Sequence, residues 1–399
     1  MPSARQRRPS ASQGTGGVHR RAGDWQAGGM DPVIVVGAGI SGVSCARVLA
    51  EAGLPVRVLD RAGQPGGRMA SERHAGRAID TGASYFTVAD ERFDLLVRDW
   101  QRRGLARPWT KTFAVYEHRT SSQHRTSSQH RTSGQHRTSG QHRNAIRLST
   151  GPLRWTATAG LRTLVQDLAD TAGLSVERTG VELVESGPSG LLVDSRPASA
   201  VVLAMPDPQA RAILHPALAA ERAGLSAAFE PVLVLSAGWP EPMWGEFDGI
   251  FVNDDERLSW ITDDGSRRGD GAPVLIAHST TSWAAAHLDQ PHLDQPHPHQ
   301  PHHPDLDQPD QATRSLLGAL REVLGIDAAP AWTHLHRWPH AKPAAGRPES
   351  FQLWPSLVGA CGDGWSTRPR VEAAYLSGLL LGEALASRLG ESGGGPARR

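Results

Sequence analysis

Cysteine is scarce in this chain of 399 residues, which contains only Cys45 and Cys361. Neither belongs to a CxxC pair, and two cysteines in a chain of this length exclude a disulfide-stabilised scaffold. Cys45 falls on the apolar face of an expected helix, and Cys361 falls at the end of an apolar run. We therefore expect two buried thiols and a reducing compartment, the cytoplasm.

Long apolar runs and an excess of charge of either sign are also missing. No run reaches the ~18 residues that a membrane-spanning helix needs, and Lys+Arg 42 balances Asp+Glu 41. This composition argues against a membrane protein and against a nucleic-acid partner. Residues 1–29 lack the apolar segment of a signal peptide, so we expect a disordered arm there, with Met30 as an alternative start.

Two stretches are repetitive. His118–Gln141 consists of four tandem hexapeptides, and the segment 287–310 repeats HLDQP before becoming a run of His and Pro. Because polar composition and frequent proline disfavour a core, we expect low-complexity inserts in surface loops at 118–143 and 287–310. A disordered tail is expected at 391–399. Histidines between 292 and 303 are potential metal ligands, but a flexible loop holds ligands poorly and we predict no metal site there.

The remaining sequence alternates short apolar runs with amphipathic segments, which is typical of an α/β protein of about two folding units. Apolar runs predict buried strands, whereas apolar residues at helical spacing predict helices. The expected strands are 33–36, 56–59, 191–193, 201–204, 232–236, 274–277 and 357–361, and the expected helices are 40–52, 161–169, 315–324 and 372–389.

A glycine-rich turn, Gly37-Ala38-Gly39-Ile40-Ser41-Gly42, follows the first expected strand. Gly37 permits the tight turn, Gly39 lets the backbone approach a pyrophosphate, and Gly42 lets helix and strand pack closely. The helix that follows offers free N–H groups and a positive dipole end to phosphates. The next strand ends in Asp60, at the distance expected of an acid that binds a ribose. This context predicts a dinucleotide-binding domain, although GxGxxG alone would be a weak signal.

Two further motifs favour FAD over a nicotinamide dinucleotide. Gly66-Gly67-Arg68 places a guanidinium, whose fork suits phosphate, shortly after the ribose acid. Near the other end of the chain, an apolar run ends in Gly362-Asp363 and a helix follows. The Asp363 carboxylate suits ribityl hydroxyl groups, and the helix start suits the flavin edge that becomes negative on reduction.

With these motifs the sequence resembles the flavin amine oxidase superfamily, and within it renalase-like proteins. The superfamily motifs continue in Arg370-Val371-Glu372, and two segments narrow the resemblance: Asp80-Thr81-Gly82-Ala83-Ser84-Tyr85-Phe86-Thr87 and His336-Arg337-Trp338. The resemblance covers residues 31 to 389 apart from the repetitive stretches. It implies a p-hydroxybenzoate-hydroxylase-like architecture, in which a substrate domain is inserted between separate segments of a FAD-binding domain.

The implied fold is α/β, with a doubly wound, Rossmann-like FAD-binding domain and a mixed-sheet α+β substrate domain. The resemblance assigns residues 31–84, 155–206 and 340–390 to the FAD-binding domain, and 85–154 and 207–339 to the substrate domain. Nothing matches the cysteine attachment of covalently flavinylated amine oxidases, so non-covalent FAD is expected. The segment 364–370, and Ala373 where the family often has Gly, depart from the family pattern close to the flavin and leave the substrate open.

The motifs and the resemblance together predict which residues contact FAD. By family analogy Gly82, Ala83 and Ser84 line the flavin, and Val181 offers its backbone to the adenine. The predicted cofactor-binding residues are Gly37, Gly39, Ile40, Ser41, Gly42, Asp60, Arg61, Gly67, Arg68, Met69, Gly82, Ala83, Ser84, Val181, Gly362, Asp363, Arg370 and Val371.

Few catalytic side chains are expected, because the flavin performs most of the chemistry in this superfamily. Trp338 is either a wall beside the isoalloxazine or an ordinary core residue. Lys342 either reaches flavin N5 through a water, as a lysine does in some amine oxidases, or is a solvated loop residue. His336 and His340 are either proton relays or hydrogen-bonded structural residues.

The resemblance predicts a FAD-dependent oxidase whose small-molecule substrate is a reduced nicotinamide dinucleotide isomer or a similar dihydro-heterocycle. Hydride transfer to flavin N5 would restore the aromatic form of the substrate, and O2 would reoxidise the flavin with formation of H2O2. Two alternatives stay open. One is a FAD-dependent amine oxidase or desaturase acting on another small substrate, and the other is a flavin-binding non-enzyme that binds a partner through its repetitive loops.

Overall fold

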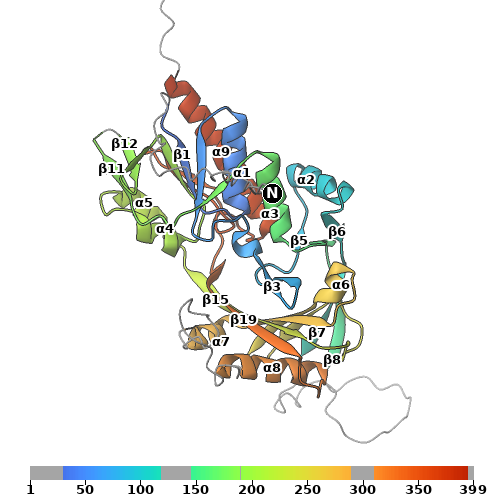
Figure 1. Cartoon of the computed structure of the whole chain (residues 1–399). Helices are drawn as coiled ribbons and strands as arrows, with labels where there is room; N and C mark the ends of the chain where they lie inside the picture. The colour runs from blue at the N-terminus through green and yellow to red at the C-terminus, as the bar shows by residue number, and fades with distance from the viewer. Residues whose placement is uncertain (1–29, 118–144, 189, 289–309, 394–399) are drawn as a thin grey trace, which may run out of the picture.

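The computed structural model describes residues 30–117, 145–188, 190–288 and 310–393. These residues form two bodies (Figure 1). The upper one is built on a mainly parallel sheet flanked by helices, and the lower one on a large mixed sheet with helices on its outer face. The expected arm and the expected inserts lie almost wholly outside the described residues.

The sheet of the upper body has six strands in the order β10-β2-β1-β14-β21-β20. Its strands are β1 (Val33–Val36), β2 (Val56–Asp60), β10 (Val176–Arg178), β14 (Ala200–Leu203), β20 (Gln352–Leu353) and β21 (Val358–Ala360). Neighbouring strands are parallel except β20, which runs antiparallel to β21. The residues that follow β1, β2, β14 and β21 therefore emerge at one edge of the sheet.

Three helices cover this sheet: α1 (Ile40–Glu51), α3 (Arg162–Thr171) and α9 (Val371–Gly393). Helices α1 and α9 approach closely because glycines face the contact. A Cβ at Gly378 would lie 1.9 Å from the carbonyl oxygen of Ser41, and a Cβ at Gly382 would lie 2.8 Å from the Cβ of Val48. Every residue of β1 and β14 is buried, which is expected of central parallel strands.

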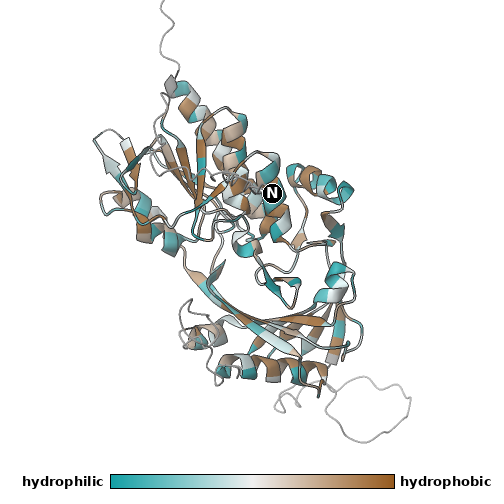
Figure 2. Ribbon diagram, in the orientation of Figure 1, coloured by the Kyte–Doolittle hydropathy of each residue, from teal (hydrophilic) through white to brown (hydrophobic). Residues whose placement is uncertain are grey.

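The sheet of the lower body has seven strands in the order β19-β15-β18-β17-β16-β7-β8. They are β7 (Thr112–Glu117), β8 (Ala145–Thr150), β15 (Phe229–Gly238), β16 (Gly249–Asn253), β17 (Leu258–Asp263), β18 (Val274–Ser279) and β19 (Trp332–Pro343). Helices α7 (Thr281–His287) and α8 (Gln311–Leu324) cover one face, where apolar side chains gather (Figure 2). Val234 and Ile276 belong to a separate apolar cluster that includes Ile79 of the upper body.

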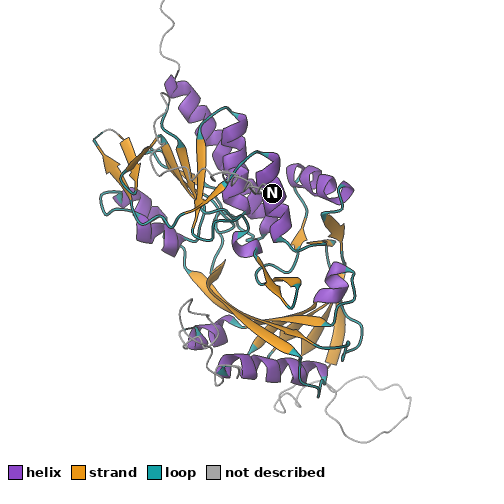
Figure 3. Cartoon of the chain, viewed as in Figure 1, coloured by secondary structure: helices purple, strands orange, loops and turns teal. Residues whose placement is uncertain are grey.

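Smaller elements connect the two sheets (Figure 3). The short helix η1 (Gly67–Met69) leads into a hairpin of β3 (Ser71–His74) and β4 (Arg77–Asp80). The remaining strands are β5 (Phe86–Thr87), β6 (Ala106–Pro108), β9 (Arg154–Ala157), β11 (Val184–Gly187), β12 (Gly190–Val193) and β13 (Arg196–Ala198). The remaining helices are α2 (Glu91–Arg102), α4 (Asp207–Ile213), α5 (Ala219–Gly224) and α6 (Asp264–Arg268).

The predicted α/β fold class is confirmed, and both cysteines are buried as predicted. Burial raises the pKa of the Cys361 thiol to about 12. One prediction was wrong: Lys342 lies in the twelve-residue strand β19 and not in a loop. Pro339 disguised this strand, but β19 is the edge strand of its sheet, where proline is tolerated. No helix among the described residues has the length and apolar character to cross a membrane.

Candidate active site

The glycine turn after β1 has the strained, close-packed backbone that its sequence predicts. Gly37 has φ +104°, and a Cβ there would lie 2.6 Å from the carbonyl oxygen of Ala204. A Cβ at Gly42 would lie 2.0 Å from the carbonyl oxygen of Gly37. Gly39 differs, because the nearest atom to its Cβ position is the Cα of Gly67 at 3.9 Å. The loop is therefore packed on the strand side and open beside Gly39.

Helix α1 begins with its first N–H groups uncapped. Gly39 is the N-cap residue, no side chain accepts a hydrogen bond from the first turn, and no acidic residue lies in that turn. The N–H groups of Ile40, Ser41 and Gly42 have no helical partner at this end. Together with the helix dipole they favour an anion at the edge of the sheet.

Asp60, at the end of β2, anchors this loop. One carboxylate oxygen accepts from the N–H of Ala38 at 2.9 Å, and the other accepts from the N–H of Ala62 at 2.8 Å. A carboxylate has about four lone-pair sites, so acceptor capacity remains. Arg61 is exposed next to Asp60. Val181 follows β10 at the same edge, next to Gly180, whose Cβ position is 4.0 Å from the Cβ of Arg61.

The two glycine motifs and the distant Gly-Asp motif meet at this edge. The N–H of Gly66 donates to the carbonyl oxygen of Ala38 at 2.9 Å, and a Cβ at Gly67 would lie 2.9 Å from the Cα of Gly39. The Arg68 guanidinium forms a bidentate pair with the Asp363 carboxylate, with distances of 3.0 and 2.6 Å. These partners are 295 residues apart in the sequence.

The segment 81–84 rests on the same arginine. The N–H of Ala83 donates to the carbonyl oxygen of Arg68 at 3.0 Å. A Cβ at Gly82 would lie 2.0 Å from that oxygen, so only glycine fits there. The indole N–H of Trp338 donates to the carbonyl oxygen of Thr81 at 2.6 Å, which ties strand β19 to this segment.

Ser84 has two partners that sequence reasoning missed. The indole N–H of Trp260 donates to the Ser84 hydroxyl at 3.2 Å, and Nε2 of His278 lies 3.5 Å from the same oxygen. Burial, and then the positive charge of Arg267, lower the pKa of His278 to about 4, so the ring is neutral near pH 7. The lone histidine in the apolar run 274–279 was the available signal.

A buried ion network fixes the segment 80–84 from below. The Asp80 carboxylate is 2.7 Å from Arg267 and 3.2 Å from Arg268, and it also accepts from the N–H of Leu161 at 2.9 Å. Arg267 donates in addition to the carbonyl oxygen of Ser84 at 2.9 Å. Burial favours the neutral form of Asp264, but Arg267, Arg268 and Arg77 outweigh it and lower the pKa to about 2. Sequence reasoning did not find this network.

Comparison with known proteins agrees with the geometry of the sheet edge. Residues 35–99 match the family described as an NAD(P)-binding Rossmann-like domain. Hydroxyneurosporene desaturase of Rubrivivax gelatinosus is 45% identical over 56 residues, and polyamine oxidase 5 of Oryza sativa subsp. japonica is 39% identical over 77 residues. These matches span 14% and 19% of this chain but only 11% and 16% of the two relatives.

Solved structures extend the likeness to nearly the whole chain. Cyclohexylamine oxidase from Brevibacterium oxydans IH-35A has a TM-score of 0.63 at 16% identity, over 90% of this chain and 99% of that chain. Putrescine oxidase with bound putrescine has a TM-score of 0.62 at 16% identity, over the same shares of 90% and 99%. This chain has the fold of these amine oxidases. The amine oxidase fold also accounts for the second sheet, which the glycine motif alone does not predict.

Not every predicted site residue of this amine oxidase fold joins the cluster around Arg68. The Lys342 ammonium is 3.0 Å from Glu230 on the neighbouring strand, and 57% of its side chain is exposed. Arg370 pairs with Glu372, which is buried and accepts from the N–H groups of Ala89 and Asp90. Glu372 therefore joins the start of α9 to the start of α2. Val371 is the first residue of α9.

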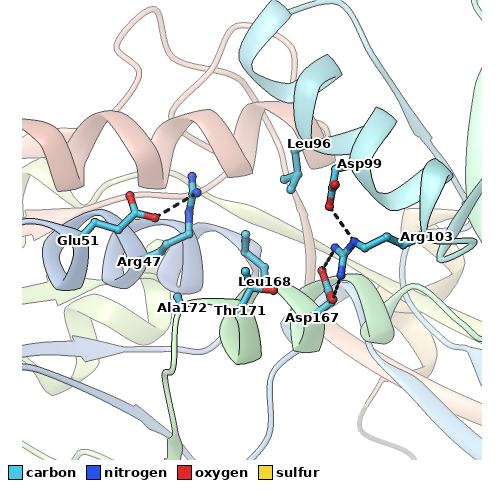
Figure 4. A pocket seen from close by; sticks show the side chains of 9 residues that line it. All are labelled: Arg47, Glu51, Leu96, Asp99, Arg103, Asp167, Leu168, Thr171 and Ala172. Atoms are coloured by element: carbon cyan, nitrogen blue, oxygen red, sulfur yellow. Dashed lines mark hydrogen bonds and ion pairs between the residues drawn. The ribbon is translucent and has the colours of Figure 1, made fainter.

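A hollow of about 220 Å³ lies elsewhere on the amine oxidase fold (Figure 4). It is lined from α1, α2 and α3, and its charges are paired: Arg47 with Glu51, and Arg103 with both Asp99 and Asp167. Arg47 and Glu51 stand near the end of α1, whereas the glycine turn stands at its start. This hollow is therefore separate from the site.

Proposed function

We propose that this chain is a FAD-dependent oxidoreductase of the amine oxidase and desaturase type that binds FAD non-covalently. The observation that carries the proposal is the convergence of four sequence-distant motifs at one edge of the parallel sheet. Ligands of open α/β sheets bind outside the carboxyl ends of the strands. The local likeness to a desaturase and a polyamine oxidase supports the same class.

The residues at this edge fit such a cofactor. Gly39 leaves open space in front of the uncapped start of α1, and Gly362, with φ +149°, has nothing within 4 Å of its Cβ position. The first turn of α1 would hold the pyrophosphate, and Asp60 would accept from the adenosine ribose. The other predicted contacts stay part of the proposal: Arg61, Gly67, Met69, Gly82, Ala83, Val181, Arg370 and Val371.

Bound FAD supplies the hydride acceptor, and O2 returns it to the oxidised form with release of H2O2. The chain contributes positioning. Trp338 is fixed by Thr81 and provides an aromatic wall, and Ser84 is fixed by Trp260 and by the neutral ring of His278. Lys342 is retained only as a candidate, because Glu230 holds its ammonium group.

We propose that the substrate is a reduced nicotinamide dinucleotide isomer or a similar dihydro-heterocycle, as in renalase-like proteins. The motivation is the resemblance in segment 80–87 and at Trp338. An aromatic cluster next to Ser84 supports a planar ring system, because such rings stack on aromatic side chains. Its members, in mutual contact with ring centroids 4.7 to 6.2 Å apart, are Tyr85, Trp109, Phe113, Phe251 and Trp260.

The test is an anaerobic spectrum of the purified protein. Flavin absorbance should be present, should bleach within seconds when aged NADH or NADPH that contains minor dihydro isomers is added, and should return with air. Freshly purified 1,4-dihydro NADH is the control and should bleach slowly. Absence of any flavin band overturns the cofactor assignment, whereas flavin bands that never bleach overturn only the substrate.

A small amine is the second candidate substrate, favoured by the amine oxidase fold. An anaerobic panel of monoamines, diamines and polyamines separates the two candidates. Bleaching by an amine but not by the dihydronicotinamide isomers would replace the first substrate with the second.

We also propose a domain division and a compartment. The FAD-binding domain comprises 31–84, 155–206 and 340–390, and the substrate domain comprises 85–154 and 207–339. The two buried, unpaired thiols support a reducing compartment, the cytoplasm. Limited proteolysis checks the division, because the first cuts should fall in the inserts at 118–143 and 287–310.

A further inference from the structure

A cluster of histidine and glutamate side chains lies between the β3–β4 hairpin and strand β19. Glu72 and His74 alternate along β3, and His334 and His336 alternate along β19, so each pair projects from one face of its strand. Oε2 of Glu72 is 2.9 Å from Nε2 of His334, and Oε1 of Glu72 is 2.9 Å from Nδ1 of His336. The hairpin belongs to the upper body and β19 to the lower one.

Three of these residues offer ligand atoms that converge on one point. One atom each from Glu72, His74 and His334 lies within 4.8 Å of the other two. Metal–ligand bonds of about 2.1 Å in a tetrahedral site place ligand atoms roughly 3.4 Å apart. The observed separations are close to this value, so small side-chain rotations are enough to bring the three atoms onto one ion.

From this geometry we propose that Glu72, His74 and His334 bind a divalent transition-metal ion of the zinc class. Two imidazoles and one carboxylate form a donor set typical of zinc, with a fourth position left for water. Carboxylate and imidazole are also the ligands least suited to a purely structural thiolate-type site, which leaves the ion exchangeable.

Neighbouring side chains support the ligands as a metal site requires. His336 holds the second oxygen of Glu72 and so orients the carboxylate. Trp332 stacks on the ring of His74, with centroids 5.7 Å apart and planes 9° from parallel. The side chains of His334 and Glu72 are 23% and 34% exposed, so a cation has access from solvent without the ligands being freely mobile.

The bound ion would fasten the two bodies together beside the candidate active site. Strand β4, the partner of β3, ends at Asp80, which leads directly into segment 81–84. Strand β19 carries Trp338, whose indole ring lies 4.4 Å from the ring of His336. The ion would thus hold the hairpin against the strand that positions Trp338.

The test is a Co²⁺ titration of the full-length, metal-stripped protein, read at wavelengths beyond the flavin bands. The parent for all variants carries serine in place of the histidines between 292 and 303, which removes competing ligands. We expect one equivalent of Co²⁺ with intense tetrahedral absorption that Zn²⁺ abolishes. Glu72→Gln, His74→Asn and His334→Asn should each lose this equivalent, and His336→Ala should weaken binding about 10- to 100-fold.

The matched control is His340→Ala, because this histidine lies on the same strand outside the cluster. It should keep the Co²⁺ equivalent, and Zn²⁺ should raise the unfolding temperature of the parent and of this control but not of Glu72→Gln. An unchanged Co²⁺ stoichiometry in folded Glu72→Gln and His334→Asn overturns the proposal. So does weak, octahedral absorption that is the same in every variant.

Discussion

The Arg68–Asp363 pair shows how one contact can join two motifs from opposite ends of a chain. Both hydrogen bonds of the guanidinium fork are used, and both side chains are partly buried. Lysine carries the same charge but presents it as a point, without the fork. The pair therefore depends on arginine for geometry as well as for charge.

Replacing either partner should weaken FAD binding. A hydrogen bond to a charged group is worth about 1.5–3 kcal/mol, so we expect Arg68→Lys and Asp363→Asn each to lower FAD affinity about 10- to 100-fold. Fluorescence titration of the apoprotein with FAD measures this change. Arg98→Lys is the control, because Arg98 makes an exposed pair with Asp94 on α2. Wild-type affinity in both pair variants would contradict the assignment.

His278 should make stability depend on pH. Its pKa is lowered from 6.5 to about 4 in the folded protein, so the unfolded chain binds the proton more readily. Stability from this group is complete above pH 6.5 and falls as the pH drops toward 4. The loss is at most about 3 kcal/mol, since one pKa unit corresponds to ~1.4 kcal/mol.

Urea unfolding at a series of pH values checks this expectation. His278→Asn should flatten the unfolding free energy between pH 6.5 and 4, whereas the exposed His215→Asn should behave as wild type. A wild-type slope in His278→Asn would show that other groups carry the pH dependence.

At the level of elements, the contact between α1 and α9 is set by small residues. The Cβ position of Gly378 is 1.9 Å from the backbone oxygen of Ser41, and backbone yields less easily than a side-chain tip. Alanine favours a helix over glycine by about 1 kcal/mol, but overpacking typically costs about 1–3 kcal/mol. The clash should dominate at this position.

Gly378→Ala should therefore lower the unfolding free energy by about 1–3 kcal/mol. Gly390 lies in the same helix with nothing within 4 Å of its Cβ position, so Gly390→Ala should be neutral or stabilising. Thermal and urea unfolding of the two variants compare packing with propensity directly. Equal effects of the two substitutions would show that the helices separate without cost.

The sequence predicted elements well where a local pattern sufficed. Strand 33–36 was predicted with its observed ends, and the helix predicted at 40–52 ends one residue earlier, at Glu51. Strand β19 was missed because Pro339 reads as a loop, and only its place at the sheet edge explains the strand. Helix α8 begins four residues before the predicted start, because Asp310 caps its first turn.

The candidate site shows the same limit. Glycine and charge patterns pointed to Gly37, Arg68 and Asp363, which the structure brings together. Trp260 and His278 carry no local signature, since their importance lies in contact with Ser84 across about two hundred residues. The partner of Lys342 was equally invisible, because Glu230 reaches it only through pairing of β15 with β19.

On the scale of the whole molecule, Arg267 connects the two bodies. It extends from α6 to Asp80 at the end of β4, and neither side chain is more than 1% exposed. Removing one partner of a buried pair leaves an uncompensated charge, which costs about 3–5 kcal/mol. The network therefore makes the relative placement of the two bodies part of the stability of the fold.

Arg267→Met should destabilise the protein by about 3–5 kcal/mol, and adding Asp80→Asn should recover part of the loss. Arg102→Met is the control, because 76% of the Arg102 side chain is exposed. Calorimetry measures the three unfolding transitions. A loss in the double variant as large as the sum of the two single losses would show that the residues do not act as a pair.

The central position of β14 and β21 has a consequence for how the protein is made. β1 pairs with β14, β14 pairs with β21, and α9 then packs on α1, so the last elements close the structure around the first. At about 5–20 residues per second, tens of seconds separate the emergence of β1 from the ribosome and that of β21. During that interval the apolar edge of β14 has no neighbour. A premature stop codon in the last tenth of the reading frame should therefore be as damaging as one near its start, because the nascent first domain needs the end of the message to fold.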